Sequence, residues 1–361
     1  MSADTSSRKR DHLKISLERD IEFEAKTTWL EYVELIHKAL PELDFDEIST
    51  ETTFLGRRFG MPLIIEAMTG GVPEAAEING NLAEAAERFS IPMGVGSQRA
   101  ALSDSSLEYT FKVARERGPN AFLIANLSGV QLVQDGVEAA EKAVEMIEAD
   151  ALAIHLNALQ ELVQPEGSTS FRGVLMAISR VVEKLDVPVI VKEIGCGISA
   201  EVAKLLEEIG VKAIDVAGAG GTCWTKIEML RATELAEEKE LLAKTFLEWG
   251  IPTAASVIEV SSTVKIEVVA SGGIRTGLDI AKALSIGADM AGVAHPLLKP
   301  AVNSVEEVMD VLTKFRNELQ AAMFLTGCGD IEALKKSPHV LFGPLLEWVG
   351  QRIKRGQYPS K

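Results

Sequence analysis

The sequence predicts a (β/α)8 (TIM) barrel, and three observations support this fold class. From about residue 60 onward, short apolar segments alternate with amphipathic stretches rich in Ala, Glu and Lys, which is the pattern of repeated strand–helix units. Eight such apolar segments occur in series, and this barrel has eight strands. Glycine-rich segments follow several of them. An open, doubly wound sheet is the structural alternative, but eight near-regular units favour closure.

The predicted strands have similar lengths and regular spacing. They cover residues 62–67, 91–96, 121–126, 151–156, 188–193, 213–218, 266–271 and 289–294. We expect one domain over 1–361, with the barrel in 61–300 and helical extensions in 1–60 and 301–361. Within the second extension, residues 305–326 predict a long helix closed by Gly327.

Composition excludes several classes of protein. The chain has 361 residues, 47% of them hydrophobic and only 5% aromatic, so the core must consist mainly of aliphatic side chains. A formal net charge of −16 argues against a general nucleic-acid or anionic-membrane surface. The three cysteines (Cys196, Cys223, Cys328) are widely spaced and odd in number, which indicates neither a metal site nor a disulfide framework. Without a signal peptide or a long apolar span, we expect a cytoplasmic protein that does not insert into a membrane.

The segment "HLNALQE", residues 155–161, places four polar side chains where an apolar strand ends. Side chains alternate between the faces of a strand, so His155 and Asn157 share the face of Ala151 and Ala153, while the leucines face the helices. The small-then-polar face points into the barrel, with its polar members at the C-terminal mouth, where such barrels carry their catalytic residues.

Glycine-rich loops predict a phosphate site at the same mouth. Residues 270–284 follow the seventh strand and open a helix, and residues 292–298 follow the eighth. The loops after these two strands often bind phosphate against a helix N-terminus. Gly272 and Gly273 allow close approach of the backbone, and Arg275 adds a positive charge. Together with the glycines of 67–71 and 218–224, this arrangement suits flavin mononucleotide (FMN), although a tight turn with helix packing also explains the glycines alone.

The chain resembles the type 2 isopentenyl-diphosphate isomerases, FMN-dependent enzymes of isoprenoid synthesis. The resemblance covers nearly the whole length, and the order and spacing of its motifs make it specific. The motifs are "RKRDH" (8–12), "FLGRRFGMPLIIEAMTGG" (54–71), "GVGSQRAAL" (94–102), "ANLSG" (125–129), "HLNALQE" (155–161), "VKEIGCGIS" (192–199), "GAGGTCW" (218–224), "FLEWGIPTA" (246–254) and "SGGIRTGLDIAKAL" (271–284). Two positions depart from the family pattern: Cys223 stands where a small polar residue is expected, and His295 where a basic residue such as Arg is commoner.

This resemblance implies an isomerase that interconverts isopentenyl and dimethylallyl diphosphate by a 1,3-allylic proton shift. It also implies reduced FMN as acid–base and cation-stabilising cofactor, NADPH as reductant, Mg²⁺ on the diphosphate, and a homotetramer or homo-octamer. The difficulty of protonating an alkene explains why such an enzyme would use a flavin. Protonating an unactivated alkene develops positive charge, which an electron-rich reduced ring stabilises, and no ordinary side chain is acidic enough to do this easily.

Site residues also follow from the resemblance. Those implied to hold FMN are Ala67, Met68, Thr69, Ser97, Asn126, Lys192, Thr222, Gly273, Arg275, Ala294 and His295. Those implied to bind substrate are Arg8, Lys9, His12, Ser97, Arg99, His155, Asn157 and Gln160. His155, Gln160 and Lys192 are the expected catalytic residues, with Gln160 mainly positioning the substrate, and Glu161 is the expected Mg²⁺ ligand.

Each key residue has a purely structural alternative. Lys192 would then pair with Glu193 or Asp215, and His155 would be a core histidine with satisfied hydrogen bonds. Glu161 would be a carboxylate at a helix N-terminus, stabilised by the helix dipole, and "RKRDH" would be a solvated tail.

Three other functions compete with the isomerase. Cys223 would be a nucleophile in one, although it lacks a nearby partner in the sequence that lowers its pKa. The second is an FMN-dependent oxidoreductase of the same barrel class. The third is a catalytically silent flavin-binding protein.

Overall fold

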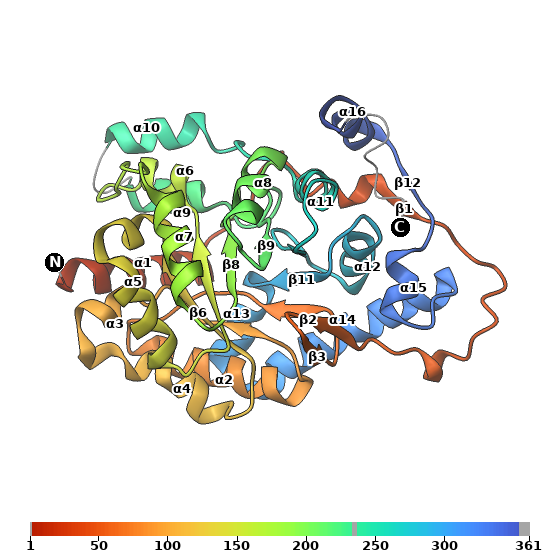
Figure 1. The fold of residues 1–361 in the computed structure, drawn as a ribbon, viewed down its shortest axis with the longest axis horizontal. Helices are drawn as coiled ribbons and strands as arrows, with labels where there is room; N and C mark the ends of the chain where they lie inside the picture. Colours follow the sequence, from red (N-terminus) through yellow and green to blue (C-terminus); the bar gives the residue numbers. More distant parts are fainter. Residues whose placement is uncertain (1, 233–236, 354–361) are drawn as a thin grey trace.

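A closed barrel of eight parallel strands forms the centre of the molecule (Figure 1). The computed structural model describes residues 2–232 and 237–353. The strands are β4 (Leu63–Ile65), β5 (Met93–Gly94), β6 (Leu123–Ser128), β7 (Ala151–His155), β8 (Val189–Lys192), β9 (Ala213–Asp215), β10 (Glu267–Ala270) and β11 (Met290–Val293). Pairing of β11 with β4 closes the barrel. The predicted fold class is confirmed, and each predicted strand overlaps one observed strand; β6 extends two residues beyond its predicted end.

Helices surround the barrel and carry clear end signals. They are α2 (Glu74–Phe89), α3 (Arg99–Ser103), α4 (Tyr109–Arg117), α5 (Gly129–Met146), α6 (Ala158–Val163), α7 (Val174–Lys184), α8 (Ala200–Glu208), α9 (Trp224–Ala232), α10 (Glu237–Thr245), α11 (Thr253–Ser261), α12 (Gly277–Ser285) and α13 (His295–Asn303). Thr276 and Asp279 form a capping box at the start of α12. Within the described ranges, no helix is both long and apolar enough to cross a membrane.

The core has an inner and an outer layer, as the alternation in β7 predicts. Ala151 and Ala153 belong to the cluster inside the barrel, whereas Leu152 and Ile154 belong to the larger cluster between strands and helices. A hairpin of β2 (Thr52–Phe54) and β3 (Arg57–Phe59) adds two phenylalanines to the inner cluster. Apolar side chains therefore fill the barrel interior, and the polar ends of the strands lie at the C-terminal mouth.

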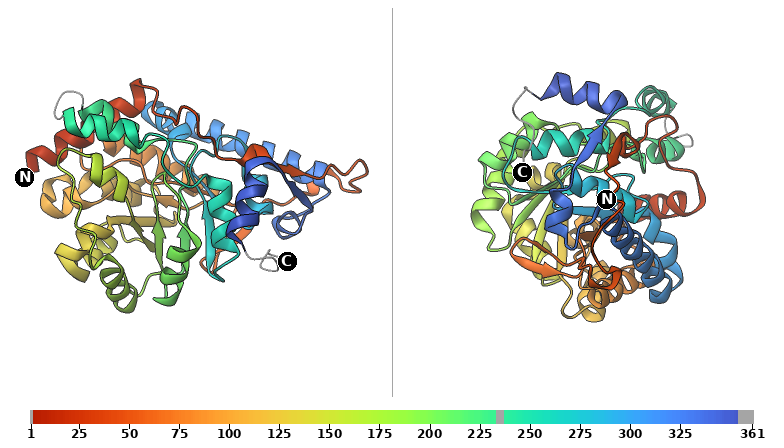
Figure 2. Two further views of the ribbon diagram at one scale, coloured as in Figure 1. Left: turned by 90° about the horizontal axis from the view of Figure 1, so that it is seen from above. Right: turned by 90° about the vertical axis from the view of Figure 1, so that its right-hand side faces the viewer.

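The two extensions contain the expected helices and also short strands that the sequence did not predict. Helix α1 (Ser2–Glu18) begins the first extension, and α14 (Val305–Thr326), α15 (Ile331–Lys335) and α16 (Gly343–Arg352) form most of the second. Helix α14 ends at Gly327, whose φ of 68° is left-handed, as predicted. Strand β1 (Val33–Leu35) pairs with β12 (His339–Leu341), which joins the two extensions at one end of the molecule (Figure 2). Such three-residue strands are too short to show a period of two.

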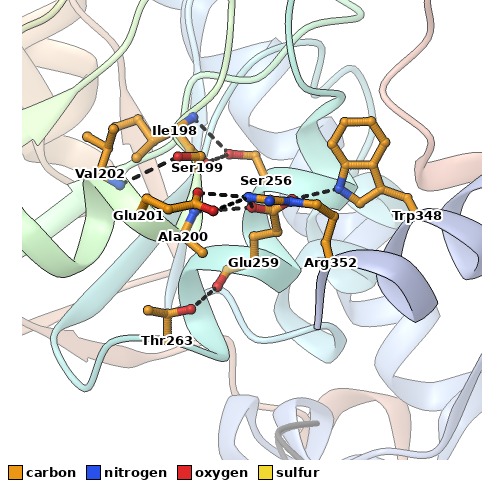
Figure 3. A network of polar contacts seen from close by, with 10 residues as sticks. All are labelled: Ile198, Ser199, Ala200, Glu201, Val202, Ser256, Glu259, Thr263, Trp348 and Arg352. Carbon is orange, nitrogen blue, oxygen red and sulfur yellow. Dashed lines mark hydrogen bonds and ion pairs between the residues drawn. The ribbon is translucent and has the colours of Figure 1, made fainter. Parts of the chain in front are cut away.

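A buried carboxylate fastens the last helix to the barrel (Figure 3). Glu259 of α11 is 1% exposed and accepts hydrogen bonds from Trp348 Nε1 (2.7 Å), Arg352 Nε (2.9 Å) and the Ala200 N–H (3.1 Å). Arg352 also reaches Glu201 of α8 at 2.7 Å. A charge this deeply buried is tolerated only when it is paired and hydrogen-bonded, so these contacts fix α16 against α8 and α11.

Candidate active site

One cavity opens at the C-terminal mouth of the barrel, beneath helix α1. Every residue that the family resemblance implies for the site lines it. These residues are Arg8, Lys9, His12, Ala67, Met68, Thr69, Ser97, Arg99, Asn126, His155, Asn157, Gln160, Glu161, Lys192, Thr222, Gly273, Arg275, Ala294 and His295. Their chemical roles remain predictions, but the fold brings all of them to one place.

The segment 155–161 turns from strand to helix at the cavity wall. His155 ends β7, and its Nδ1 lies 2.7 Å from Asn126 Oδ1 at the end of β6. Asn157 is buried just before α6, and its amide donates to Gln160 Oε1 (3.1 Å) and Glu161 Oε1 (3.2 Å). Asn157 thus holds Gln160 and Glu161 in place, and its own Oδ1 has no hydrogen-bond partner among the described residues.

A buried lysine carries the positive charge on the barrel floor. Lys192 Nζ lies 2.8 Å from Asp215 Oδ2 and 3.4 Å from Glu66 Oε2. Burial disfavours its charged form, but Asp215 and Glu66 outweigh burial and raise the pKa of Lys192 above its usual value. The structural alternative of a pair with Asp215 is therefore real, although Lys192 also lines the cavity. Its contact with Glu193 involves only that residue's carbonyl oxygen, at 2.9 Å.

His155 is a neutral imidazole near neutral pH. Burial, followed by the charges of Lys192 and Lys9, lowers its pKa to about 3. Its one N–H is then on Nδ1, which faces the Asn126 Oδ1 acceptor, so His155 presents neither a positive charge nor a free N–H to an anion in the cavity. The cations over this part of the site must come from other residues.

Helix α1 supplies those cations and covers the mouth. It packs against α3, α9 and α13. Lys9 Nζ donates to the Ser97 carbonyl at 2.6 Å, and burial with the nearby Arg8 charge lowers the pKa of Lys9 to about 7. Arg8 and His12 lie on the same face of the helix. Arg99 is exposed at the rim and forms no ion pair with any described residue. The basic cluster is thus an ordered part of the cavity rather than a solvated tail.

A second charged cluster behind Gln160 was not predicted. Glu228 of α9 is fully buried, and it accepts hydrogen bonds from Gln160 Nε2 (2.9 Å) and Arg231 NH1 (3.0 Å). His12 Nε2 lies 2.9 Å from the same carboxylate. Burial favours the neutral acid, but His12 and the hydrogen bonds outweigh it and lower the pKa of Glu228. Nothing in the sequence links residues 12, 160 and 228, because these contacts join three distant segments.

Backbone donors without partners mark the corner after β10 and β11. Gly273 has a φ of 77°, which favours glycine, and its N–H and that of Ala294 meet no acceptor among the described residues. Helix α13 begins beside them at His295, whose Nε2 lies 3.1 Å from the Ser16 carbonyl of α1. Free N–H groups at a helix N-terminus are the donors that a phosphate requires, so this corner fits the phosphate of FMN.

The predicted phosphate contact Arg275 is already paired. Its Nε and NH2 donate to Glu22 Oε1 at 3.1 and 2.6 Å. A bound phosphate would compete with that carboxylate for the same guanidinium. The N–H groups of Gly273 and Ala294 are therefore the stronger part of the phosphate site in this structure.

We expect Glu22→Gln to tighten FMN binding about three- to fivefold, because a partly exposed ion pair contributes up to about 1 kcal/mol. Titration of flavin fluorescence quenching measures this change in Kd. Glu24→Gln is the matched control, since Glu24 lies on the same segment but pairs with Lys226. Weaker binding by Glu22→Gln would show instead that Glu22 orients Arg275 for the phosphate.

Cys223 does not form part of the cavity wall. It is buried, its Sγ lies 3.4 Å from the Leu247 carbonyl, and burial raises its pKa. A thiol with a raised pKa is a poor nucleophile. These observations favour a packing role.

A metal would depend on one carboxylate here. The described residues contain no group of three or more His, Cys, Asp or Glu placed to hold an ion. Glu161 lies at the cavity and accepts the Ser168 N–H at 2.6 Å as well as the Asn157 amide. A carboxylate has about four acceptor sites, so Glu161 still fits Mg²⁺, which takes one or two carboxylates together with phosphate oxygens and water.

Comparisons with known proteins agree with this geometry. The profile of the FMN-dependent dehydrogenase family matches residues 2–160 and 167–341. The chain is 48% identical to the isopentenyl-diphosphate delta-isomerase of Archaeoglobus fulgidus, over 96% of this chain and 99% of that protein. It is also 48% identical to the enzyme of the same name from Halobacterium salinarum, over 97% and 98% of the two chains.

Solved structures share the barrel. A lactate oxidase from Pediococcus acidilactici superposes with a TM-score of 0.68 at 15% identity, covering 95% of this chain and 94% of that one. A mandelate oxidase superposes with a TM-score of 0.64 at 18% identity, covering 94% and 98%. At these identities the likeness concerns the fold alone. The curated relatives and the profile decide the family: this chain belongs to the isopentenyl-diphosphate delta-isomerases, within the FMN-dependent dehydrogenase family.

Proposed function

We propose that this chain interconverts isopentenyl and dimethylallyl diphosphate, with reduced FMN bound in the cavity. The observation that carries the proposal is the pair of anion sites around one cavity. The N–H groups of Gly273 and Ala294 form one, and the cations Arg8, Lys9 and Arg99 form the other. A flavin phosphate suits the first site, and a substrate diphosphate suits the second.

The chemistry needs an electron-rich surface below the alkene, and bound reduced FMN supplies it. Lys192, with its charge held by Asp215, stabilises negative charge at the floor of the cavity. Gln160, fixed by Asn157 and Glu228, presents a neutral amide to the substrate. Neutral His155 is held in place by donating its one N–H to Asn126 Oδ1. These residues orient the substrate and balance its charge, while a neutral amide is too weak an acid to protonate an alkene.

Mg²⁺, the reductant and the assembly complete the proposal. We infer that Glu161 binds Mg²⁺ jointly with the diphosphate, because a single carboxylate suffices when phosphate oxygens share the ion. We also propose NADPH as reductant, a cytoplasmic location, and a homotetramer or homo-octamer. Light scattering of the FMN-bound protein measures the assembly size.

An oxidoreductase is the main alternative, because the chain matches the profile of the FMN-dependent dehydrogenases and the oxidase structures have the same barrel fold. Such an enzyme acting on a hydroxyacid needs a general base. His155, the histidine at the end of a barrel strand here, has its pKa lowered to about 3 and is a weak base. The buried Cys223 gives no support to nucleophilic catalysis. The isomerase therefore suits these side chains better.

One anaerobic reaction tests the proposal. Protein, FMN, NADPH, Mg²⁺ and isopentenyl diphosphate in D₂O are expected to give dimethylallyl diphosphate that contains deuterium, without stoichiometric loss of NADPH. Product is identified by mass spectrometry. Continuous NADPH consumption would indicate an oxidoreductase. Bound flavin with neither isomer nor label would indicate a silent flavin-binding protein.

The low pKa of Lys9 predicts a pH dependence of substrate binding. A diphosphate would raise the pKa of Lys9 again, so binding requires proton uptake above pH 7. We expect KM for isopentenyl diphosphate to rise about tenfold per pH unit from pH 7 to 8.5. Lys9→Met is expected to raise KM about 10- to 100-fold at pH 7 and to flatten this slope, because a charge-assisted hydrogen bond is lost. Lys14→Met, on the exposed side of α1, is the control and should change neither.

A further inference from the structure

Glu66 is a buried acid in the cavity for which the isomerisation has no use. It follows β4, its side chain is 11% exposed, and it lines the cavity beside Ala67. Its Oε2 lies 3.4 Å from Lys192 Nζ, while Asp215 lies closer to the same ammonium, at 2.8 Å. Lys192 is thus shared by two carboxylates, of which Asp215 is the closer partner.

The cluster of Lys192, Asp215 and Glu66 is not neutral when all three side chains are ionised. With all three groups ionised, two carboxylates and one ammonium give a net charge of −1 in a place with little water. Asp215 is tied down further, because Ser271 Oγ donates to its Oδ1 at 2.6 Å and the Ala217 N–H at 3.2 Å. Glu66 has no comparable support among side chains. Burial and the Asp215 charge raise the pKa of Glu66 to about 7.

Among the residues that the structure describes, the other groups around Glu66 supply no second positive charge. From β11, Gly292 leaves room for it, since a Cβ there would lie 2.5 Å from Glu66 Oε1. From β7, His155 is neutral near pH 7. Glu193, next to Lys192, is a second acid whose pKa burial raises to about 7. Its carboxylate accepts the N–H groups of residues 194–196 at 2.6–2.8 Å and does not line the cavity.

We propose that Glu66 takes up a proton when flavin bound in this cavity is reduced to its anion. Two electrons and one proton convert neutral flavin to the anionic reduced form, and a flavin in this cavity would add that negative charge to a site whose cluster already has an excess of −1. A second proton, from solvent to the Glu66 carboxylate, restores a neutral cluster of Lys192, Asp215 and Glu66. The electrons come from a hydride donor of the nicotinamide class or, in the test, from dithionite. The inference rests on the proposed function only in requiring bound FMN.

The slope of the flavin midpoint potential against pH measures the proton count. Each proton per two electrons contributes about 30 mV per pH unit. Below pH 7, Glu66 is already protonated in the oxidised protein, so we expect about 30 mV per pH unit. Above pH 7 we expect about 59 mV, since two protons are then taken up. Glu66→Gln should remain near 30 mV throughout, and Glu66→Asp should keep the steeper limb.

Glu193→Gln is the matched control, because its acid has a similar pKa but points away from the cavity. It is expected to retain the wild-type slopes. Equal slopes in wild type and Glu66→Gln, or loss of the steep limb in Glu193→Gln alone, would overturn the proposal. A pH-indicator dye measures net proton uptake by the wild type on dithionite reduction, after subtraction of the protons that oxidation of dithionite to sulfite releases at the same pH, so the count holds even if a variant folds poorly. The experiment uses no isoprenoid substrate, and a failed isomerase assay therefore leaves its result intact.

Discussion

Glu161→Gln is expected to lower Mg²⁺-dependent turnover of isopentenyl diphosphate by about 100-fold or more, while bound flavin retains its absorbance. Even partners that only support metal ligands cost 10- to 100-fold when removed, so loss of a ligand costs at least as much. Gln keeps the size of the side chain and an acceptor for the Ser168 N–H, so the fold of α6 should survive. Turnover measured across a range of Mg²⁺ concentrations should show a higher half-saturation point.

Glu166→Gln is the control for this prediction. Glu166 is a carboxylate on the loop after α6, but it pairs with Arg231 at 2.5 Å and lies 3.8 Å from Arg8. Its replacement should leave the Mg²⁺ half-saturation point unchanged. If Glu161→Gln instead released the flavin, or if both variants shifted the Mg²⁺ dependence equally, Glu161 would have no specific role as a metal ligand.

The barrel and much of its mouth could be predicted because side chains alternate between the two faces of a strand, and this alternation is visible in a few consecutive residues. Residues two apart in a strand share a face, so Ile190 and Lys192 point inward together, as do Ala153 and His155. The same rule could have found Glu66. It stands two positions after Ile64, which belongs to the inner cluster, and it is the one charged residue of the predicted strand 62–67.

Contacts between distant segments could not be predicted in the same way. The buried carboxylate of Glu228 is compensated by residues from α1, α6 and its own helix, and no spacing along the chain reveals that meeting. The pairing of β1 with β12 is similar, since two three-residue strands are separated by about 300 residues. Such features depend on how the extensions pack onto a completed barrel.

Charge states also required the structure. The resemblance implied His155 as a substrate-binding residue, and its burial beside Lys192 makes it neutral near pH 7. The resemblance implied Lys9 as a substrate-binding residue, and its buried position on α1 beside Arg8 brings its pKa to about 7. Desolvation depends on what covers a side chain, and a linear pattern does not contain that information.

Lys192→Met is expected to lower turnover about 10²- to 10³-fold, the cost of removing one preorganised donor that stabilises developing negative charge. It should also lower the free energy of unfolding by about 3 kcal/mol, because Asp215 and Glu66 would remain buried without their cation. The raised pKa of Lys192 stabilises the fold fully below the unfolded pKa of lysine, and this stabilisation is lost only when pH rises through the folded pKa. The difference in unfolding free energy between wild type and variant, measured by denaturant unfolding, should therefore grow from pH 6 to pH 9, because Glu66 is protonated at the acid end and lacks its cation when it ionises at the basic end.

The double variant Lys192→Met with Asp215→Asn separates stability from catalysis. Removing one carboxylate leaves Glu66 as the sole acid of the cluster, and Glu66 becomes neutral by taking up a proton near pH 7. Most of the lost stability should then return. Turnover should stay low, because no ammonium remains on the cavity floor to stabilise the reduced flavin. Recovery of turnover along with stability would mean that Lys192 serves only to balance two buried acids, as in the structural alternative considered from the sequence. The midpoint potential of bound flavin provides a second measurement that needs no substrate. If it falls in both variants, the Lys192 ammonium stabilises the reduced flavin directly.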